Sequence, residues 1–354
     1  MPWTAIDKAL RLERPVHAQD LAALDARGHA LGGAVFNQCR LAGACFSRCD
    51  LRGIRFIDCD LRDADFSHAD LRQGAFIDCQ LAGARFGASQ IDGNCWSGCD
   101  LRDSLWQHVR LANSAIVNSM LAGASLHGAR FERVALLDNQ LGGADLSQAN
   151  LLHTVINPAD LREVALGGLR ADGAVLIAAN FRNKPMAGIV LERCTMQQAD
   201  FSGADLRGAV LNESNFHQAR FEGTCMHGAS ALRAMFLKAR FERVDLAGAQ
   251  LAGAIFQQAT LSDVRLDQAA LATSVWNASS LHCVSYAGAD LRYSQFEHAS
   301  GKHLDFSGAC LDYSNVHNAS LGDGCGRAAS RRRQRGTDPV LLAAQSRTLT
   351  LEKQ

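Results

Sequence analysis

A five-residue period runs through most of the chain and excludes ordinary secondary structure as its origin. From Leu31 to Leu321 a large apolar residue returns at almost every fifth position, and no residue is inserted or lost. Small side chains fill the position two residues earlier. A helix repeats every 3.6 residues and a strand every two, so neither explains this spacing. The chain is therefore an array of short repeats. The first large residues are Leu31, Phe36, Leu41, Phe46, Leu51 and Phe56, and the first small ones are Ala34, Cys39, Ala44 and Cys49.

A longer period of twenty residues is superimposed on the first. Cysteine recurs at this interval at Cys39, Cys59, Cys79 and Cys99, while Phe alternates with Leu every ten residues. If twenty residues make one coil, two aromatic columns stack on opposite sides, so a coil has an even number of sides. The columns would contain Phe36, Phe56, Phe76 and Trp96 on one side, and Phe46, Phe66, Phe86 and Trp106 on the other.

Several triplets resemble those of pentapeptide repeat proteins. They are Ala64-Asp65-Phe66, Ala69-Asp70-Leu71, Ala144-Asp145-Leu146, Ala149-Asn150-Leu151 and Ala204-Asp205-Leu206. The resemblance implies an all-β solenoid, a right-handed quadrilateral parallel β-helix with one pentapeptide on each side. Both the small and the large repeating residues would point inward.

Three segments are expected along the chain. Residues 1–28 would form a helical N-terminal cap, residues 29–323 a β-helix of about fifteen coils, and residues 324–354 a basic, flexible tail. Within the first segment we expect a short helix over residues 17–28, with Leu21 and Leu24 on one side and Gly28 as its stop. This helix could instead dock a partner.

Charge and hydropathy exclude several functions. Lys and Arg number 36, as do Asp and Glu, so no net field attracts nucleic acid or an anionic membrane. Charged residues interrupt the first twenty residues, which are therefore no signal peptide, and no apolar run approaches the ~20 residues of a membrane span. These features predict a cytoplasmic protein without membrane contact.

The cysteines are predicted to be structural. Six of the twelve occupy the small inward positions, where they behave as small apolar residues, and the chain contains no Cys-x-x-Cys motif. We therefore expect no metal and no cofactor, with a redox or metal role as the alternative. These six are Cys39, Cys49, Cys59, Cys79, Cys99 and Cys194.

Acidic and basic residues flank buried leucines in a recurring triplet. In Asp50-Leu51-Arg52, Asp60-Leu61-Arg62, Asp70-Leu71-Arg72 and Asp100-Leu101-Arg102, one charge of each sign points outward on either side of the leucine. Stacked coils would align these charges in columns of Asp and of Arg. Solvated faces are the simplest interpretation.

Two stretches depart from the repeat. Within residues 164–190, Leu169 and Ile189 are large at small positions, Ala171 is small at a large one, and Lys184 would point inward just before Pro185. Because an unpaired buried ammonium is costly, we expect a kink or loop there, or an outward Lys184, and a functional protrusion is the alternative. After Leu321 the five-residue repeat is no longer visible in the sequence. The remaining chain is basic through Arg327, Arg331, Arg332, Arg333 and Arg335, with a short helix expected over residues 340–344 and nucleic-acid contact as an alternative role.

The candidate site is an apolar outward face, because no catalytic motif is present and a filled interior offers no active-site cleft. The side centred on Phe36, Phe56 and Phe76 carries apolar residues interleaved with Asn and Gln, and few charges. Exposed apolar surface marks interaction sites, although β-branched residues also suit strands and a terminal segment could cover them. The predicted partner-binding residues are Val35, Ile57, Ile77, Val117, Leu137, Val155, Val175, Ile177, Met235, Leu237, Ile255 and Val275.

The sequence thus predicts a non-enzymatic scaffold that binds another protein, or its own copy, through this face. Similarity to repeat proteins with a short N-terminal helix ahead of a long array also suggests an accessory or adaptor protein of a bacterial type VI secretion system. Family resemblance allows a third role, modulation of a type II topoisomerase such as gyrase by DNA mimicry. That role requires an acidic face, which the balanced charge and the basic C-terminal residues argue against.

Overall fold

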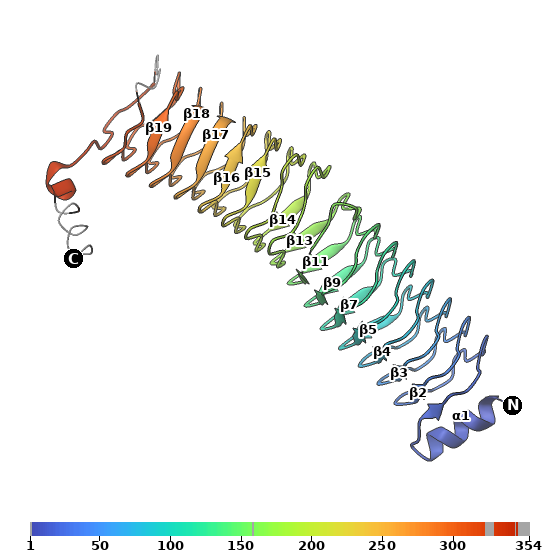
Figure 1. Ribbon diagram of the computed structural model, residues 1–354. Helices are drawn as coiled ribbons and strands as arrows, with labels where there is room; N and C mark the ends of the chain where they lie inside the picture. Colours follow the sequence, from blue (N-terminus) through green and yellow to red (C-terminus); the bar gives the residue numbers. More distant parts are fainter. Residues whose placement is uncertain (1, 158, 323–328, 344, 346–354) are drawn as a thin grey trace. The chain divides into compact units, whose positions relative to one another are not determined.

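The chain forms a parallel β-solenoid, which confirms the predicted all-β fold (Figure 1). A computed structural model describes residues 2–157, 159–322, 329–343 and 345. The chain divides into two compact units, Met1–Ala179 and Asn180–Gln354. Each unit is built from turns of twenty residues that stack in parallel register. In the first unit, for example, Phe36 pairs with Phe56 and Phe56 with Phe76.

Backbone hydrogen bonds in both axial directions hold the turns together. We call the large inward residue of each five-residue repeat its central residue. The amide of the central residue donates to the turn ahead, as from Leu41 to the Asp60 carbonyl at 2.7 Å. The residue just before a central position donates to the turn behind, as from Asp60 to the Cys39 carbonyl at 3.0 Å. Each turn therefore provides hydrogen-bond partners for the backbone N–H and C=O groups of its neighbours. Buried backbone groups need such partners.

A tight corner follows almost every central residue of the described turns. The second residue after it has positive φ, for example 66° at Gly53 and 51° at Asp58. This conformation is uncommon for residues other than glycine. It is compensated here because the corner amide also bonds to the next turn, as from Asp58 to the Ile77 carbonyl at 2.9 Å. The corners limit strands to a few residues on each side.

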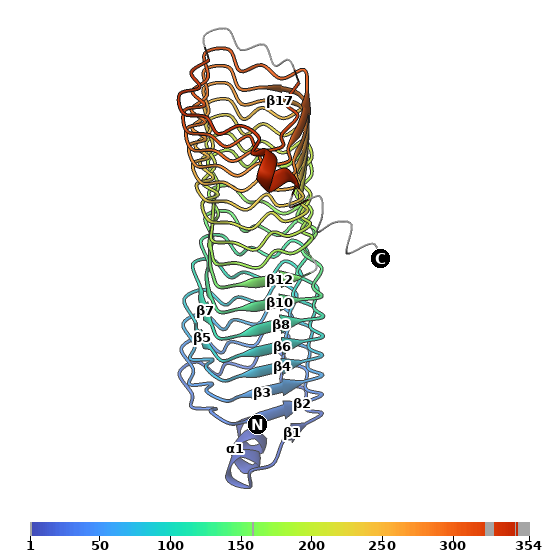
Figure 2. The same ribbon diagram turned by 90° about the vertical axis from the view of Figure 1, so that its left-hand side faces the viewer.

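The first unit contains helix α1, Pro2–Arg11, and two parallel sheets. One sheet has the order β1-β2-β3-β4-β6-β8-β10-β12, and Figure 2 shows β2 to β12 of this sheet one above another. The second sheet includes β5-β7-β9-β11-β13 in that order. The strands of the first sheet are β1 Val16–His17, β2 Val35–Asn37, β3 Arg55–Ile57, β4 Ala75–Ile77, β6 Cys95–Ser97, β8 Ala115–Val117, β10 Ala135–Leu137 and β12 Val155–Asn157. Those of the second are β5 Gln90–Asp92, β7 Arg110–Ala112, β9 Arg130–Glu132, β11 Asn150–Leu152 and β13 Arg170–Asp172.

The second unit contains a five-stranded parallel sheet of order β15-β16-β17-β18-β19, together with strand β14. Many other sides are held by single β-bridges, such as those from Met235 to Ile255 and from Ile255 to Val275. The strands are β14 Val190–Glu192, β15 Arg220–Glu222, β16 Arg240–Glu242, β17 Thr260–Arg265, β18 Ser280–Ser285 and β19 Ser300–Lys302.

Aromatic columns occupy part of the interior of each unit, and those of the first unit are the predicted ones. In the first unit the ring centroids of Phe36 and Phe56 lie 5.3 Å apart, and those of Phe46 and Phe66 lie 5.1 Å apart. In the second unit the stacked pair Phe216 and Phe236 is separated by 5.0 Å. Stacked rings add about 0.5–1.5 kcal/mol each to the free energy gained by burial alone.

The N-terminal helix does not lie where the sequence suggested. Residues 17–28 form a solenoid turn, because Val16 pairs with Phe36 and Asp20 bridges Arg40. Leu21 is a central residue of that turn and Leu24 occupies the next small inward position, so their three-residue spacing imitates a helical one. The helix is instead α1, whose Ile6 is fully buried and whose Trp3 stacks on His29 of the first turn at 4.0 Å.

Part of the predicted flexible tail also belongs to the solenoid. Ser330 bridges Cys310 and Arg335 bridges Asn315, so residues 329–335 continue the twenty-residue register. The repeat could not be recognised here from the sequence because Arg331 and Gln334 are polar residues at inward positions. Backbone pairing between turns does not depend on the side chain, so the fold continues. A short helix does form over residues 339–343 and is capped by Asp338. Residue 344, predicted in that helix, and Arg327 lie outside the described residues.

The irregular stretch 164–190 keeps the five-residue period, and the loop expected there does not form. Leu169 and Ala171 are both buried, so the large and the small residue exchange places without changing the backbone. Pro185 bridges Asp205, and the neighbouring Lys184 is half-buried, which lowers the pKa of its ammonium group. The division between the two compact units falls inside this stretch.

Candidate interaction surface

The twelve predicted partner-binding residues all lie next to buried central residues, with side chains at the surface. Alternation along a strand explains this placement, since Ile57 and Ile77 follow the buried Phe56 and Phe76 directly. None of the twelve is fully buried, and Ile77, Ile177 and Met235 are the most exposed at 37%, 39% and 38%. Eight of them belong to the first unit, and Met235, Leu237, Ile255 and Val275 belong to the second.

The structure groups the first-unit residues into separate clusters. Ile57 and Ile77 are register partners on β3 and β4, and we call them the β3–β4 pair. Ser97 on β6 separates this pair from a second group, the β8–β12 cluster, while Val35 has Arg55 as its neighbour on β3. Sequence reasoning had treated these residues as one face. The β8–β12 cluster consists of Val117 and Leu137, which pair directly, and of Val155, which precedes the buried Ile156 rather than following it and pairs with Val175 on the next turn.

A third apolar group lies in the second unit. Met235 bridges Ile255, and Ile255 bridges Val275, so these three side chains occupy equivalent places on successive turns. Leu237 lies on the other side of the buried Phe236 from Met235. Polar residues end the column, because Asn215 precedes Met235 and Gln295 follows Val275 in the register.

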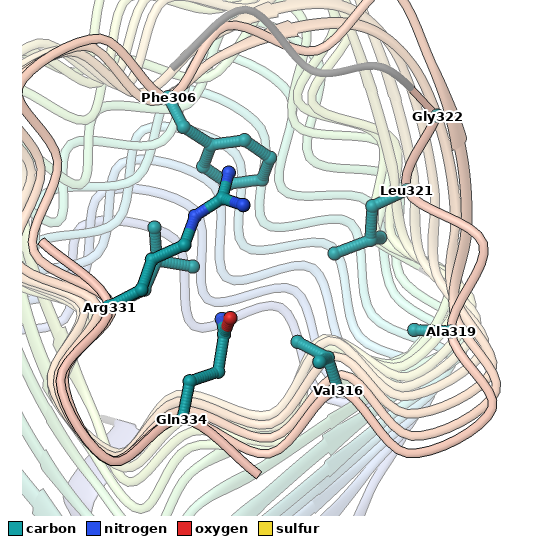
Figure 3. A pocket seen from close by; sticks show the side chains of 8 residues that line it. Phe306, Val316, Ala319, Leu321, Gly322, Arg331 and Gln334 are labelled. Atoms are coloured by element: carbon teal, nitrogen blue, oxygen red, sulfur yellow. The ribbon is translucent and has the colours of Figure 1, made fainter. Parts of the chain in front are cut away.

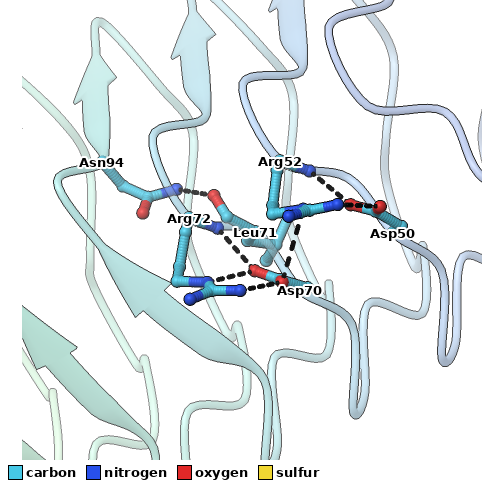
Figure 4. Close-up of polar contacts among 6 residues, drawn as sticks. All are labelled: Asp50, Arg52, Asp70, Leu71, Arg72 and Asn94. Carbon is cyan, nitrogen blue, oxygen red and sulfur yellow. Dashed lines mark hydrogen bonds and ion pairs between the residues drawn. The ribbon is translucent and has the colours of Figure 1, made fainter.

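The charged triplets form ion pairs within single repeats, as Figure 4 shows for two of them. Arg52 binds Asp50 through two hydrogen bonds of 2.9 and 2.7 Å, and Arg72 binds Asp70 at 2.8 and 2.6 Å. Such bidentate contacts are stronger than single ones. Hydrogen bonds from Arg52 lower the pKa of Asp50 to about 2. In the part of the chain that the structure describes, eight triplets pair in this way: Asp25 with Arg27, Asp50 with Arg52, Asp60 with Arg62, Asp70 with Arg72, Asp100 with Arg102, Asp160 with Arg162, Asp205 with Arg207 and Asp290 with Arg292.

Stacking of turns also aligns these pairs along the solenoid. Asp50 bridges Asp70 in the register, and Arg52 reaches Asp70 on the next turn at 3.8 Å. The predicted charge columns therefore exist, but each carboxylate has a guanidinium bound to it. Pairing of this kind neutralises the carboxylates of these triplets.

The six predicted inward cysteines are buried and bond to the backbone. The Cys39 thiol donates to the Val16 carbonyl at 3.2 Å, and Cys59 to the Phe36 carbonyl at 3.4 Å, one turn behind in each case. Burial raises the pKa of the Cys49 thiol, which keeps it protonated and unreactive. Among the described residues the cysteines are all free, and no three His, Cys, Asp or Glu side chains are grouped closely enough to hold a metal.

One exposed aromatic group escaped sequence reasoning. Tyr293 and Tyr313 stack with centroids 4.9 Å apart, and the Arg333 guanidinium lies 5.8 Å from the Tyr313 ring. All three occupy corner positions of successive turns, so their twenty-residue spacing was the available signal.

In the part of the chain that the structure describes, no helix has the length and apolar character needed to cross a membrane.

These features define a repeat solenoid with a largely apolar interior and with ion pairs and apolar groups on its outer surface. A family model for a pentapeptide repeat region matches residues 31–94, and one for pentapeptide repeats (8 copies) matches residues 189–229 and 236–273. These matches confirm the resemblance to pentapeptide repeat proteins over those residues. Comparison with curated proteins found no match.

Several solved structures of pentapeptide repeat proteins are similar in part. A trypsin-treated form of QnrB1, a plasmid-mediated fluoroquinolone resistance protein, is 21% identical with a TM-score of 0.26, covering 44% of this chain and 92% of QnrB1. HetL, which is involved in heterocyst differentiation regulation in the cyanobacterium Nostoc, is 20% identical with a TM-score of 0.17 and coverages of 93% and 92%. A thylakoid-lumen protein of Arabidopsis thaliana is 26% identical with a TM-score of 0.17 and coverages of 37% and 71%.

Proposed function

We propose that this protein is a non-enzymatic interaction scaffold that binds a protein, either a different one or a second copy, through its exposed apolar groups. The observation that carries the proposal is the presence of separate groups of aliphatic side chains at the surface, the β3–β4 pair and the β8–β12 cluster in the first unit and the column of Met235, Ile255 and Val275 in the second. Elsewhere on the surface the Asp and Arg of each recurrent charged triplet form an ion pair with each other. The apolar groups are therefore the part of the surface that gains most from contact with another protein.

The β3–β4 pair is well suited to initiate such contact. Ile57 and Ile77 are register partners on adjacent strands, so their side chains are held at one strand spacing, about 4.8 Å. A backbone bonded on both sides keeps these residues in place before binding, which reduces the entropy that association costs. Each square ångström of apolar surface removed from water contributes about 25 cal/mol.

The pairing of charges argues against the DNA-mimicry alternative. A protein surface that imitates DNA needs unpaired negative charges at regular intervals. In the described triplets each Asp is bound by the Arg two residues later, so the carboxylate columns are neutralised within each repeat. The apolar groups carry no charge and do not resemble the phosphates of DNA.

A double substitution in the β3–β4 pair tests the proposal. Ile57→Glu with Ile77→Glu places two carboxylates in the apolar pair without changing the buried Phe56 and Phe76. We expect the variant to fold but to lose its association. The readouts are circular dichroism for folding, sedimentation velocity for self-association, and quantitative mass spectrometry of proteins captured from a bacterial lysate.

The matched control is Asn37→Glu with Ser97→Glu. These residues occupy the equivalent outward places on the neighbouring strands β2 and β6 but are polar in the native chain. The control should keep the association that the isoleucine variant loses. Equal retention by both variants, or equal loss in both, would contradict a role for the apolar pair.

A further inference from the structure

A cavity of about 360 Å³ lies at the end of the solenoid in the second unit (Figure 3). Phe306, Leu311, Val316 and Leu321 provide its apolar lining, and Arg331 and Gln334 provide its polar groups. The volume is at the lower end of the range of ligand pockets, roughly 300–1,000 Å³. A small molecule, rather than a large one, fits such a space.

The cavity exists because the inward residues of the last described turn are polar. Arg331 and Gln334 occupy the two kinds of inward position, since Ser330 and Arg335 pair with Cys310 and Asn315 of the turn before. On the preceding turns Leu311 and Leu291 occupy the place of Arg331, and Ser314 and Ser294 occupy the place of Gln334; these smaller or apolar side chains are all buried. Here Val316 and Leu321 remain half-buried, so the interior of the solenoid is accessible at this end.

Arg331 is the unusual member of the lining. The arginines of the charged triplets each bind an aspartate, whereas Arg331 forms no ion pair with another described residue. Figure 3 shows its guanidinium pointing into the cavity towards the Phe306 ring. The Gln334 amide nitrogen donates to Ser314 at 3.0 Å, which leaves the amide oxygen as an acceptor. The Arg331 guanidinium is thus available to bind an anion whose apolar part contacts the apolar lining of the cavity.

We propose that this cavity binds a small amphiphile with an anionic head, a medium-chain carboxylate. The apolar chain contacts Phe306, Leu311, Val316 and Leu321, and the carboxylate binds the Arg331 guanidinium through two parallel hydrogen bonds. Guanidinium matches carboxylate geometry in this bidentate way. No covalent step is involved.

Titration of the full-length protein with decanoate, below its micelle concentration, tests the site. Isothermal calorimetry gives the affinity, and methyl NMR shows whether the resonances of Leu311 and Val316 shift on binding. We expect saturable binding at one site, with decanol binding at least tenfold more weakly. Arg331→Gln should weaken decanoate binding at least tenfold and bring it to the level of decanol.

Two further variants distinguish the cavity from general charge attraction. Arg332→Gln removes an exposed cation from the same turn and should leave decanoate affinity unchanged. Ala319→Leu extends a half-buried side chain of the lining into the cavity, and should abolish binding while Arg331 is retained. Circular dichroism of each variant checks folding. The proposal is overturned if binding is not saturable, if decanol binds as tightly as decanoate, if Arg332→Gln weakens binding as much as Arg331→Gln, or if Ala319→Leu still binds.

Discussion

Single inward residues are matched to their counterparts one turn away, and Gly74 with Asn94 is the clearest example. Asn94 is a buried polar residue at a small inward position, and its side-chain amide donates to the Leu71 carbonyl at 2.6 Å (Figure 4). A Cβ atom at Gly74 would lie 2.9 Å from that carbonyl oxygen and 3.0 Å from the Asn94 amide nitrogen. Glycine at position 74 therefore makes room for the asparagine.

Gly74→Ala should lower the free energy of unfolding by about 1–3 kcal/mol, because the new methyl group overpacks this contact. Gly87→Ala is the control, since a Cβ there meets no atom of the described structure within 4 Å. Urea denaturation followed by circular dichroism measures both. Adding Asn94→Ala to Gly74→Ala should recover part of the loss, and equal stability of the two single variants would show that the contact yields freely.

Side-chain size along the sequence was sufficient to predict which residues point inward. It was insufficient for pairs that compensate each other. Leu169 with Ala171 was expected to distort the chain, yet both are buried in regular turns. Arg331 was assigned to a tail because an arginine is not expected at an inward position. Each of these outcomes depends on a neighbour in space, which a rule for single positions does not include.

At the scale of elements, the sequence predicted the strands far better than the helices. Most strands follow from a large apolar residue that repeats every twenty positions, and the backbone hydrogen bonds keep the same register at exceptions such as Gly301 in β19. The segment around Leu21 and Leu24 was assigned to a helix because inward residues of a pentapeptide array are separated alternately by three and two residues. Helix α1, in contrast, begins outside the array and gave no periodic signal.

Helix α1 covers the first turn, and loss of its buried contact should expose that turn. Ile6→Ala removes a fully buried side chain, a change that costs about 2–5 kcal/mol in protein cores. We expect faster hydrogen exchange at the amides of Ala18 and Leu21, which donate to the carbonyls of Asn37 and Arg40.

Thr4→Ala is the matched control for this helix, because Thr4 is exposed on the same element. Hydrogen–deuterium exchange with mass spectrometry resolves the N-terminal peptides of both variants. Unchanged protection of residues 16–24 in Ile6→Ala would mean that the first turn is stable without its helix.

The candidate surface was also predicted at the scale of elements, and only in part. Alternation along a strand gave the outward direction of residues such as Ile57 and Met235. It gave no information on grouping, because Ser97 and Arg55 interrupt the apolar residues only when turns are stacked in register. The identity of a partner depends on a second molecule and is not encoded in the spacing of one chain.

At the scale of the whole molecule, the eight Asp–Arg pairs make stability sensitive to acid. Hydrogen bonds from the arginines lower the pKa of Asp25 and Asp50 to about 2, and lower the pKa of Asp60 and Asp100 as well. Because the folded-state pKa is below the unfolded one, the unfolded chain binds protons first. The stabilisation is present above about pH 4 and is lost as the pH falls towards about 2.

Replacing four of these aspartates measures the effect. Asp→Asn at Asp50, Asp60, Asp70 and Asp100 should reduce the difference in urea midpoint between about pH 5 and about pH 2.5. The control replaces four corner aspartates, Asp58, Asp63, Asp78 and Asp103, which have positive φ and form no ion pair with another described residue. A pH dependence that falls equally in both variants would assign acid sensitivity to net charge rather than to the pairs.

The unbroken twenty-residue register also constrains how such a gene can change length. Gain or loss of one residue within a turn would shift every later side chain from the interior to the surface or the reverse. Duplication or deletion of a whole turn's codons preserves the facing of every residue and places equivalent side chains on each other again. Lineages of this protein should therefore differ in length by complete turns, so that the number of turns is a heritable quantity that changes in whole steps.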